Sequence, residues 1–300
     1  MISERVKEQA GSGILTRIKD GWDAYSQLTK FKLSTLVALS GMHGYLMAAG
    51  SDFDWFLLCM VGLGAMLVTG ASNILNQIFE KEYDKLMART ANRPLPSGKM
   101  TTAQGVWLAL LLGIGGVYIM GHFFNLPAAL FSIIALLSYA FVYTPMKRIS
   151  PIAVFVGAIP GALPPLIGWV AETGTLGDGA IILFIFQFFW QFPHFWAIAW
   201  QMDEDYQKAG FKMLPTAAGR TKFSALLILI YTLALVPLSF FAVKAEMVGW
   251  WGFGGLALCG ILFAIPAFAL YRSMEKKRAR QVMFASFFYL PLIQVVFLAG

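Results

Sequence analysis

Residues 55–84 read WFLLCMVGLGAMLVTGASNILNQIFEKEYD, an apolar run that ends in regularly spaced polar residues. Asn76, Glu80 and Asp84 are four positions apart, so on an α-helix they lie about 40° from one another and form one stripe. A helix over all of 55–84 would be about 45 Å long, whereas the hydrocarbon core of a bilayer is about 30 Å thick. The stretch therefore predicts a membrane helix whose last turns carry oxygen-bearing side chains to the membrane surface.

The composition of the whole chain is that of a membrane protein. Its 300 residues are 58% hydrophobic and 13% charged, whereas a soluble domain has about 45–50% apolar and about 25% charged residues. The apolar segments are continuous rather than alternating, which argues against a transmembrane β-barrel. The net charge of +7 is then typical of basic cytoplasmic loops, and we expect no nucleic-acid partner.

The distribution of positive charge predicts how the chain is oriented. If the N-terminus is cytoplasmic, the cytoplasmic pieces hold 22 of the 23 Lys and Arg residues, and only Lys244 lies on the other side. This positive-inside asymmetry predicts a cytoplasmic N-terminus and an external C-terminus, in what we expect to be a bacterial inner membrane. Nine membrane helices are expected, over residues 31–49, 55–80, 102–121, 126–143, 152–171, 179–200, 222–243, 248–271 and 281–299.

A weak internal repeat predicts how these helices are arranged. The two longest cytoplasmic loops, 80–101 and 201–222, lie four helices apart, and each has acids, then bases, then a proline. We therefore expect an all-α polytopic membrane protein, with two four-helix halves around a central cavity and a ninth helix added. Residues 1–30 are expected to form a cytoplasmic N-terminal segment, and residues 31–300 a single membrane domain.

The first long loop carries side chains suited to a divalent cation and a diphosphate. Asn76, Glu80 and Asp84 offer the oxygen ligands that Mg²⁺ prefers. Arg89 and Arg93 follow, and guanidinium groups match phosphate oxygens with two parallel hydrogen bonds. The pattern therefore favours a site for Mg²⁺ and diphosphate, while a solvated helix end at the membrane surface remains the alternative.

Two further features are expected at membrane depth. His194 lies near the end of the sixth helix, where an ionisable side chain faces the bundle interior either as a functional group or bonded to a neighbouring helix. The fifth helix contains Pro160, Pro164 and Pro165, which should kink or break it. Such a break would either line a cavity or serve packing.

Five stretches taken together resemble the UbiA-type intramembrane prenyltransferases, and in particular the branch of that family that uses heme as its prenyl acceptor. The resemblance covers about residues 30–300. The family usually has Asp where this chain has Glu80, and its second motif is usually Asp-x₃-Asp, whereas Asp205 is followed four positions later by Ala209. The stretches that carry the resemblance are 76–95, 143–148 (YTPMKR), 161–169 (GALPPLIGW), 193–197 (PHFWA) and 205–215.

The resemblance implies the transfer of a farnesyl group from farnesyl diphosphate to a vinyl group of heme B. It implies Mg²⁺ as the cofactor, the lipid bilayer as the surroundings, and heme A synthase or terminal oxidase assembly as candidate partners. Asn76, Glu80 and Asp84 would hold Mg²⁺ against the diphosphate. The other implied site residues are Arg89, Arg93, Lys147 and Arg148 as a cationic clamp, Tyr143 as a substrate contact, His194 as a heme contact, and Asp203 and Asp205 from the second half.

Two other functions are compatible with the sequence. A prenyltransferase with an aromatic acceptor would share the acidic stripe but would not need the Pro-His-Phe-Trp stretch at 193–196. A solute transporter also uses broken helices and repeats around a site in the membrane. It would not need acids and arginines concentrated at one end of the bundle.

Overall fold

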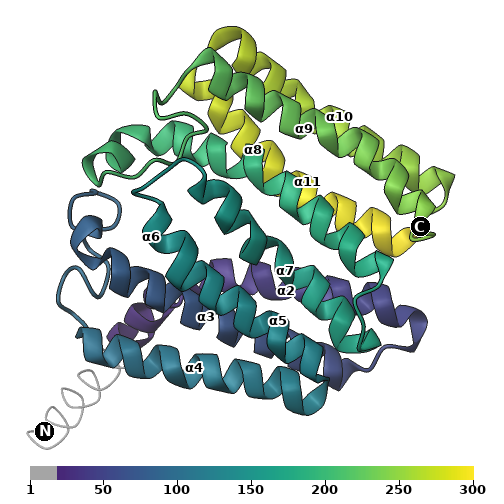
Figure 1. Cartoon of the computed structure of the whole chain (residues 1–300), viewed down its shortest axis with the longest axis horizontal. Helices are drawn as coiled ribbons and strands as arrows, with labels where there is room; N and C mark the ends of the chain where they lie inside the picture. Colours follow the sequence, from purple (N-terminus) through teal and green to yellow (C-terminus); the bar gives the residue numbers. More distant parts are fainter. Residues whose placement is uncertain (1–18) are drawn as a thin grey trace, which may run out of the picture.

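The computed structural model describes residues 19–300, and all of its long elements are α-helices (Figure 1). The all-α prediction is therefore confirmed for these residues, and residues 1–18 of the expected N-terminal segment lie outside them. Two short elements, the π-helical η2 (Ser138–Tyr143) and α6 (Thr144–Met146), continue α5, and η1 (Gly50–Asp52) follows α2. The long helices are α2 (Phe31–Ala49), α3 (Trp55–Asp84), α4 (Thr102–Phe123), α5 (Leu126–Leu137), α7 (Ala153–Thr173), α8 (Asp178–Lys208), α9 (Lys222–Lys244), α10 (Trp250–Ser273) and α11 (Lys276–Ala299).

Eight helical segments in the described part of the chain are long and apolar enough to cross a membrane, with Leu126–Met146 acting as one of them. Each corresponds to an expected span. The remaining expected span is present as α2, but Lys32, His43 and its small polar residues lower its hydropathy, and it is not among the eight. The multi-pass membrane fold is thus confirmed, whereas the count of nine spans is not.

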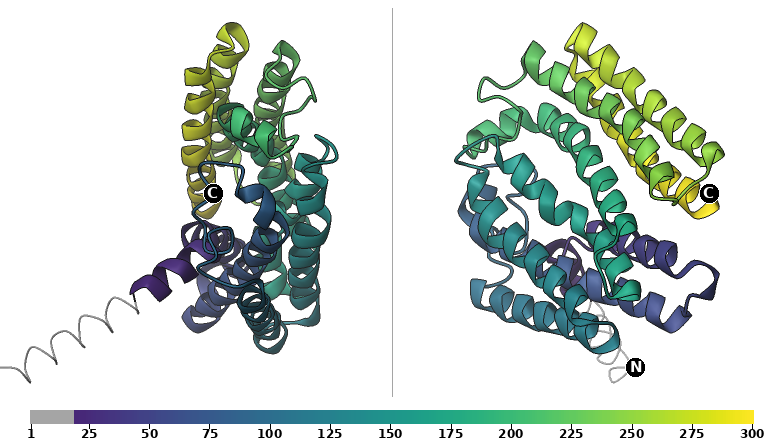
Figure 2. Two further views of the ribbon diagram at one scale, coloured as in Figure 1. Left: turned by 90° about the vertical axis from the view of Figure 1, so that its left-hand side faces the viewer. Right: turned by 45° about the vertical axis from the view of Figure 1, so that its right-hand side comes forward.

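The helices form two groups that meet along α7 (Figures 1 and 2). In one group α3 packs against α2 and α4, and α5 packs against α4. In the other, α8 contacts α9 and α11, and α10 also contacts both of these helices. Helix α7 contacts α2, α5 and α8, so it joins the two groups. A small cavity at this junction is lined by residues of α2, α7, α8 and α11, among them His43, Gln187 and Gln294.

Helix α7 is continuous from Ala153 to Thr173 despite its three prolines. Of the two expected outcomes, a kink or a break, the break therefore does not occur. Neighbouring helices in a membrane can satisfy the backbone groups that a proline leaves without a partner. Pro165 has no amide hydrogen for the carbonyl of Gly161, and the side-chain amide of Gln187 on α8 donates to that carbonyl at 3.5 Å. The prolines are buried among neighbouring helices, and Pro165 also lines the small cavity at the junction, so packing and the lining of a cavity both apply to this helix.

Glycines allow α2 and α7 to approach closely. A Cβ atom added to Gly168 would lie 1.8 Å from the carbonyl oxygen of Gly41, and one added to Gly44 would lie 1.9 Å from that of Pro165. Both obstacles are backbone atoms, which cannot move aside as a flexible side chain can. The contact between the two groups of helices therefore depends on residues without side chains.

We expect Gly168→Ala to prevent this packing, because overpacking against a fixed backbone costs about 1–3 kcal/mol or more. The measurement is the yield of monodisperse protein in detergent, followed by size-exclusion chromatography. Gly254→Ala on α10 is the matched control, since an added Cβ there meets no atom within 4 Å. Equal yields of the two variants would contradict the packing account.

Candidate active site

The polar stripe of α3 is buried at one end of the helical bundle. Asn76, Glu80 and Asp84 are 1%, 5% and 0% exposed, so they are not the solvated helix end that the sequence left open. They lie on consecutive turns of one continuous helix, as their spacing predicts. Burial of two carboxylates requires compensating charge, because an unpaired buried ion costs several kcal/mol.

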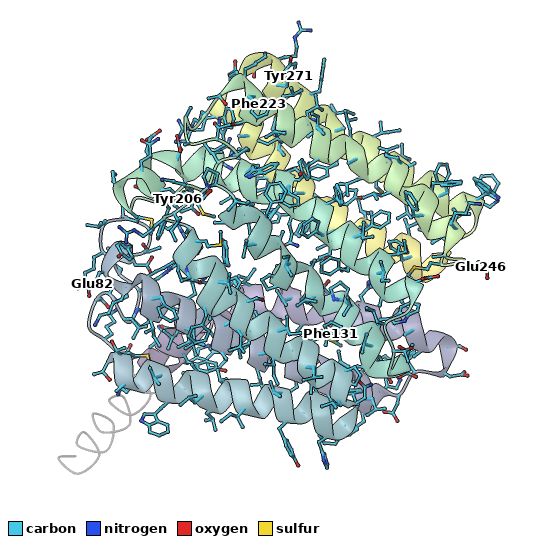
Figure 3. All side chains as sticks on the ribbon, in the orientation of Figure 1. Glu82, Phe131, Tyr206, Phe223, Glu246 and Tyr271 are labelled. Carbon is cyan, nitrogen blue, oxygen red and sulfur yellow. The ribbon has the colours of Figure 1, made fainter. Side chains whose placement is uncertain are left out.

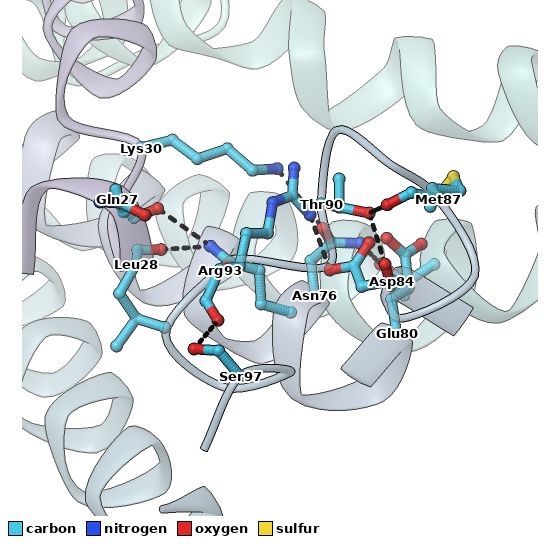
Figure 4. Close-up of polar contacts among 12 residues, drawn as sticks. Gln27, Leu28, Lys30, Asn76, Glu80, Asp84, Met87, Thr90, Arg93 and Ser97 are labelled. Carbon is cyan, nitrogen blue, oxygen red and sulfur yellow. Dashed lines mark hydrogen bonds and ion pairs between the residues drawn. The ribbon is translucent and has the colours of Figure 1, made fainter. Parts of the chain in front are cut away.

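Cations from three separate segments provide that charge, and Figure 4 shows two of them, Lys30 and Arg93. One comes from the residue before α2, one from the residue after α6, and one from the loop that follows α3. Charged groups in hydrogen-bond contact make stronger bonds than neutral pairs. The pairs are Lys30 Nζ with Asn76 Oδ1 at 3.4 Å, Lys147 Nζ with Glu80 Oε1 at 2.8 Å, and Arg93 Nη1 with Asp84 Oδ2 at 2.7 Å.

Lys30 is a site residue that the sequence analysis did not identify. Its backbone is left-handed, with φ of 49°, and this reversal turns its side chain toward α3. Gln77 of α3 holds the preceding turn by donating to the carbonyl of Leu28 at 2.6 Å. The loss of water around its ammonium group, together with the charges of Arg93 and Lys147, lowers the pKa of Lys30 to about 7. A negatively charged ligand would therefore favour its charged form.

The loop after α3 folds back onto the end of that helix. Thr90 is fully buried and its hydroxyl donates to the backbone carbonyl of Asp84 at 2.8 Å. The backbone amide of Arg93 donates to the carbonyl of Thr90 at 3.0 Å. These local bonds bring the Arg93 guanidinium to the Asp84 carboxylate, as Figure 4 shows. Arg89 lies on the same loop but is exposed.

The π-helical turn η2 positions the second group of predicted site residues. The hydroxyl of Thr144 donates to the carbonyl of Tyr139, five residues earlier, and accepts a hydrogen bond from Asn76 Nδ2 at 3.0 Å. Such wide turns recur at functional sites. Lys147 follows directly, with its ammonium 4.6 Å from the ring centre of Tyr143. Burial opposes its charge, but the Glu80 carboxylate, together with Tyr143 and Tyr139, outweighs this effect and raises the pKa of Lys147.

The ends of α3 and α8 lie at the same end of the bundle, as the sequence predicts (Figure 3, Glu82 and Tyr206). The segment after α6 connects them. Arg148 lies over the ring of Tyr83 at 4.1 Å, and the carbonyl of Lys147 accepts a hydrogen bond from the backbone amide of Lys212 at 2.7 Å. Residues from both halves thus meet around Lys147.

The acids of α8 have local partners instead. Helix α8 runs to Lys208, beyond its expected end at residue 200, so Asp203 and Asp205 lie on the helix. Asp203 Oδ2 is 3.5 Å from Arg220 Nε, and Asp205 Oδ1 is 3.2 Å from Lys208 Nζ. Within residues 19–300, no ion pair connects either acid to the cations of the α3 stripe. Their predicted catalytic role stays a prediction.

The oxygen donors of the stripe suit a hard cation such as Mg²⁺. Asp84 Oδ1 is buried and has no hydrogen-bond partner among the described residues, so it is available as a ligand. No group of three or more His, Cys, Asp and Glu side chains gathers in residues 19–300. A metal held here would therefore need phosphate oxygens or water to complete its ligands, which is the usual arrangement for Mg²⁺.

These features define a class of protein: a multi-pass helical membrane protein with a buried site of carboxylates and cations at one end of its bundle. The chain belongs to the UbiA prenyltransferase family, whose sequence profile matches residues 36–290. It is therefore a prenyltransferase, and the alternative function of a solute transporter is excluded.

Individual relatives agree with this assignment. The chain is 47% identical to the protoheme IX farnesyltransferase of Cytophaga hutchinsonii over 276 residues, which cover 92% of this chain and 96% of that protein. Among solved structures, a digeranylgeranylglyceryl phosphate synthase superposes with a TM-score of 0.77 at 23% identity, over 94% and 98% of the two chains. A UbiA homologue from Archaeoglobus fulgidus, bound to GPP and Mg²⁺, gives a TM-score of 0.68 at 15% identity, over 91% and 99%. The structural likeness establishes the shared fold.

Proposed function

We propose that this chain transfers the farnesyl group of farnesyl diphosphate to a vinyl group of heme B, giving heme O and diphosphate. The observation that carries the proposal is the group of three cations, the half-buried Lys30 and Arg93 and the buried Lys147, around the buried α3 stripe. The name of the 47%-identical relative supports heme as the acceptor. The Pro-His-Phe-Trp stretch at 193–196, which the heme-using branch carries, supports the same acceptor.

The cations would act on the leaving diphosphate. When the bond between farnesyl C1 and oxygen breaks, negative charge accumulates on the diphosphate, and fixed positive groups in a poorly hydrated site stabilise it. Arg93 can offer two parallel N–H groups to phosphate oxygens, whereas Lys30 and Lys147 act as point charges. Arg148 and Arg89 lie on the adjoining segments and complete the proposed clamp.

We assign Mg²⁺ to Asn76, Glu80 and Asp84, with Asp84 Oδ1 as a ligand atom that has no hydrogen-bond partner among the described residues. When bound, the ion would supply further positive charge to the leaving group. The carboxylates would hold it against the phosphate oxygens, while the neighbouring cations turn to the same diphosphate. The Mg²⁺ and GPP in the Archaeoglobus structure support such an arrangement.

The acceptor would lie deeper among the helices. The allylic cation adds to the terminal vinyl carbon of heme B, and the other vinyl carbon then takes a hydroxyl group from water, which releases one proton. His194 is 8% exposed, among aromatic side chains of α8 and α11. We propose that it contacts the heme, and that the apolar helices around it limit the access of water to the carbocation.

The positive-inside asymmetry supports an orientation in the membrane. We propose that the site end faces the cytoplasm of a bacterium, with the N-terminus inside and the C-terminus outside. Farnesyl diphosphate is amphipathic, so it would then enter with its charged diphosphate at the cytoplasmic end of the bundle and its apolar chain among the helices. Heme A synthase or terminal oxidase assembly would be the next user of the product.

Expression of the chain in a host that lacks heme O tests the proposal. Extracted hemes are analysed by mass spectrometry, and we expect a farnesylated, hydrated heme that is absent from cells with the empty vector. A parallel incubation of membranes with farnesyl diphosphate and an aromatic quinone precursor tests the other acceptor. Prenylation of that acceptor with unmodified heme would refute heme as the substrate.

A further inference from the structure

Two contacts to the ring of His194, and a third contact that fixes one of its neighbours, hold this ring in one orientation. Its Nδ1 lies 2.8 Å from Ser286 Oγ on α11. The indole of Trp190, one turn earlier on α8, stacks on the imidazole with ring centres 4.8 Å apart and an interplanar angle of 16°. Trp190 is itself held, because its Nε1 donates to the backbone carbonyl of Ser286 at 2.9 Å. The ring can therefore neither rotate nor tilt without breaking one of these contacts.

The two hydrogen bonds of Ser286 Oγ determine which nitrogen of the His194 ring carries the hydrogen. Ser286 Oγ lies 2.5 Å from the carbonyl oxygen of Met283, and two oxygen atoms approach so closely only with a proton between them. The hydroxyl proton of Ser286 is therefore committed to that carbonyl. The oxygen can then only accept from His194, so Nδ1 carries the hydrogen and Nε2 presents a lone pair.

The other buried histidine near the junction has the opposite arrangement. His43 Nε2 lies 3.1 Å from the backbone carbonyl of Gln294, and a carbonyl can only accept, so Nε2 of His43 carries the hydrogen. Its contact on α11 is eight residues from Ser286, which is about 12 Å along a helix. Of these two rings, only His194 has a partner that leaves Nε2 free to act as a ligand.

We infer that Ser286 is a positioning residue that fixes the tautomer of His194, so that His194 Nε2 binds the iron of the heme substrate. The inference rests on the proposed function for the identity of that substrate. A histidine that ligates a metal almost always donates its other ring hydrogen to an acceptor, and removal of that acceptor typically weakens metal binding about 10- to 100-fold. Ser286 is fully buried, so water does not readily replace it.

The test is a titration of the purified full-length protein with hemin, followed by visible absorption spectroscopy. We expect wild type to give the spectrum of a histidine-ligated heme, and His194→Ala to lose it. Ser286→Ala should bind hemin about 10- to 100-fold more weakly, with a smaller histidine-ligated fraction at saturation. Ser286→Cys, which keeps the shape of the side chain with a slightly larger atom but accepts hydrogen bonds poorly, should also bind hemin more weakly than wild type.

Ser239→Ala is the matched control, because Ser239 on α9 is equally buried and its hydroxyl also bonds to a carbonyl of its own helix, that of Leu235 at 3.2 Å. We expect it to bind hemin as wild type does. A wild-type spectrum and affinity in Ser286→Ala, or a histidine-ligated spectrum in His194→Ala, would overturn the inference even if heme O is formed. Failure of wild type to produce heme O would instead overturn the proposed function.

Discussion

Replacement of Asp84 by asparagine should reduce the rate of heme farnesylation by about 100- to 1,000-fold, the range observed when one preorganised electrostatic group is removed from an active site. Asp84 is fully buried, and its Oδ1 has no hydrogen-bond partner among residues 19–300. Asparagine keeps the shape and an acceptor for Arg93 but removes the negative charge that would hold Mg²⁺. The measurement is the initial rate of heme O formation in membranes, normalised to the amount of protein.

Glu82→Gln is the control for this substitution. Glu82 lies half a turn away on the same helix, is 68% exposed, and pairs with Lys85 at 2.6 Å. We expect its rate to match that of wild type, because the charge is outside the buried site. If Asp84→Asn retained activity within a few-fold of the Glu82→Gln variant, the assignment of Mg²⁺ to the stripe would be wrong.

Replacement of Lys147 by methionine should destabilise the protein and abolish its activity. The Lys147 and Glu80 side chains are 11% and 7% exposed and 2.8 Å apart. Loss of one partner from such a buried pair leaves the other charge uncompensated, which costs about 3–5 kcal/mol. The measurements are thermal unfolding in detergent and the rate of farnesyl transfer.

The double variant Lys147→Met, Glu80→Gln separates the two effects. Removal of both charges should restore much of the stability, because replacement of a whole buried ion pair is often nearly neutral. Activity should remain lost, since the diphosphate would lack one of its cations and Mg²⁺ one of its ligands. Recovery of activity together with stability would mean that the pair serves only the fold.

The local pattern of the sequence was sufficient to predict the helices and the stripe. Apolar runs locate helices wherever they cross the hydrocarbon core, and a spacing of four places side chains on one face whatever surrounds the helix. Hydropathy is less informative about helix ends outside the core. Helix α8 therefore continues to Lys208 and α11 begins at Lys276, because charged residues can extend a helix into water without an apolar signal.

The cationic half of the site was only partly predictable. Lys30 lies 46 positions before Asn76, and it reaches the stripe only because the backbone reverses at a residue with positive φ. Thr144 depends on the π-helical turn, which has no simple sequence signature. Arg220, the partner of Asp203, could have been predicted as a neighbour of the α8 acids, because it lies in the same basic loop, residues 201–222.

The structure also explains why the proline-rich helix does not break. Pro160, Pro164 and Pro165 are unfavourable in an isolated helix, and the sequence alone does not reveal that Gln187 lies beside the carbonyl of Gly161. Close contact with α2 through Gly168 then holds the helix in place. Tertiary contacts thus override a local preference that is correct for the segment alone.

Incubation of the purified protein with farnesyl diphosphate, heme B and Mg²⁺, followed by mass analysis of the heme, tests the central claim most directly. We expect farnesylated, hydrated heme and one diphosphate per product, with both lost when Mg²⁺ is chelated and when Asp84 is replaced by asparagine. Unmodified heme in the complete reaction, from protein that is folded and monodisperse, would contradict the account.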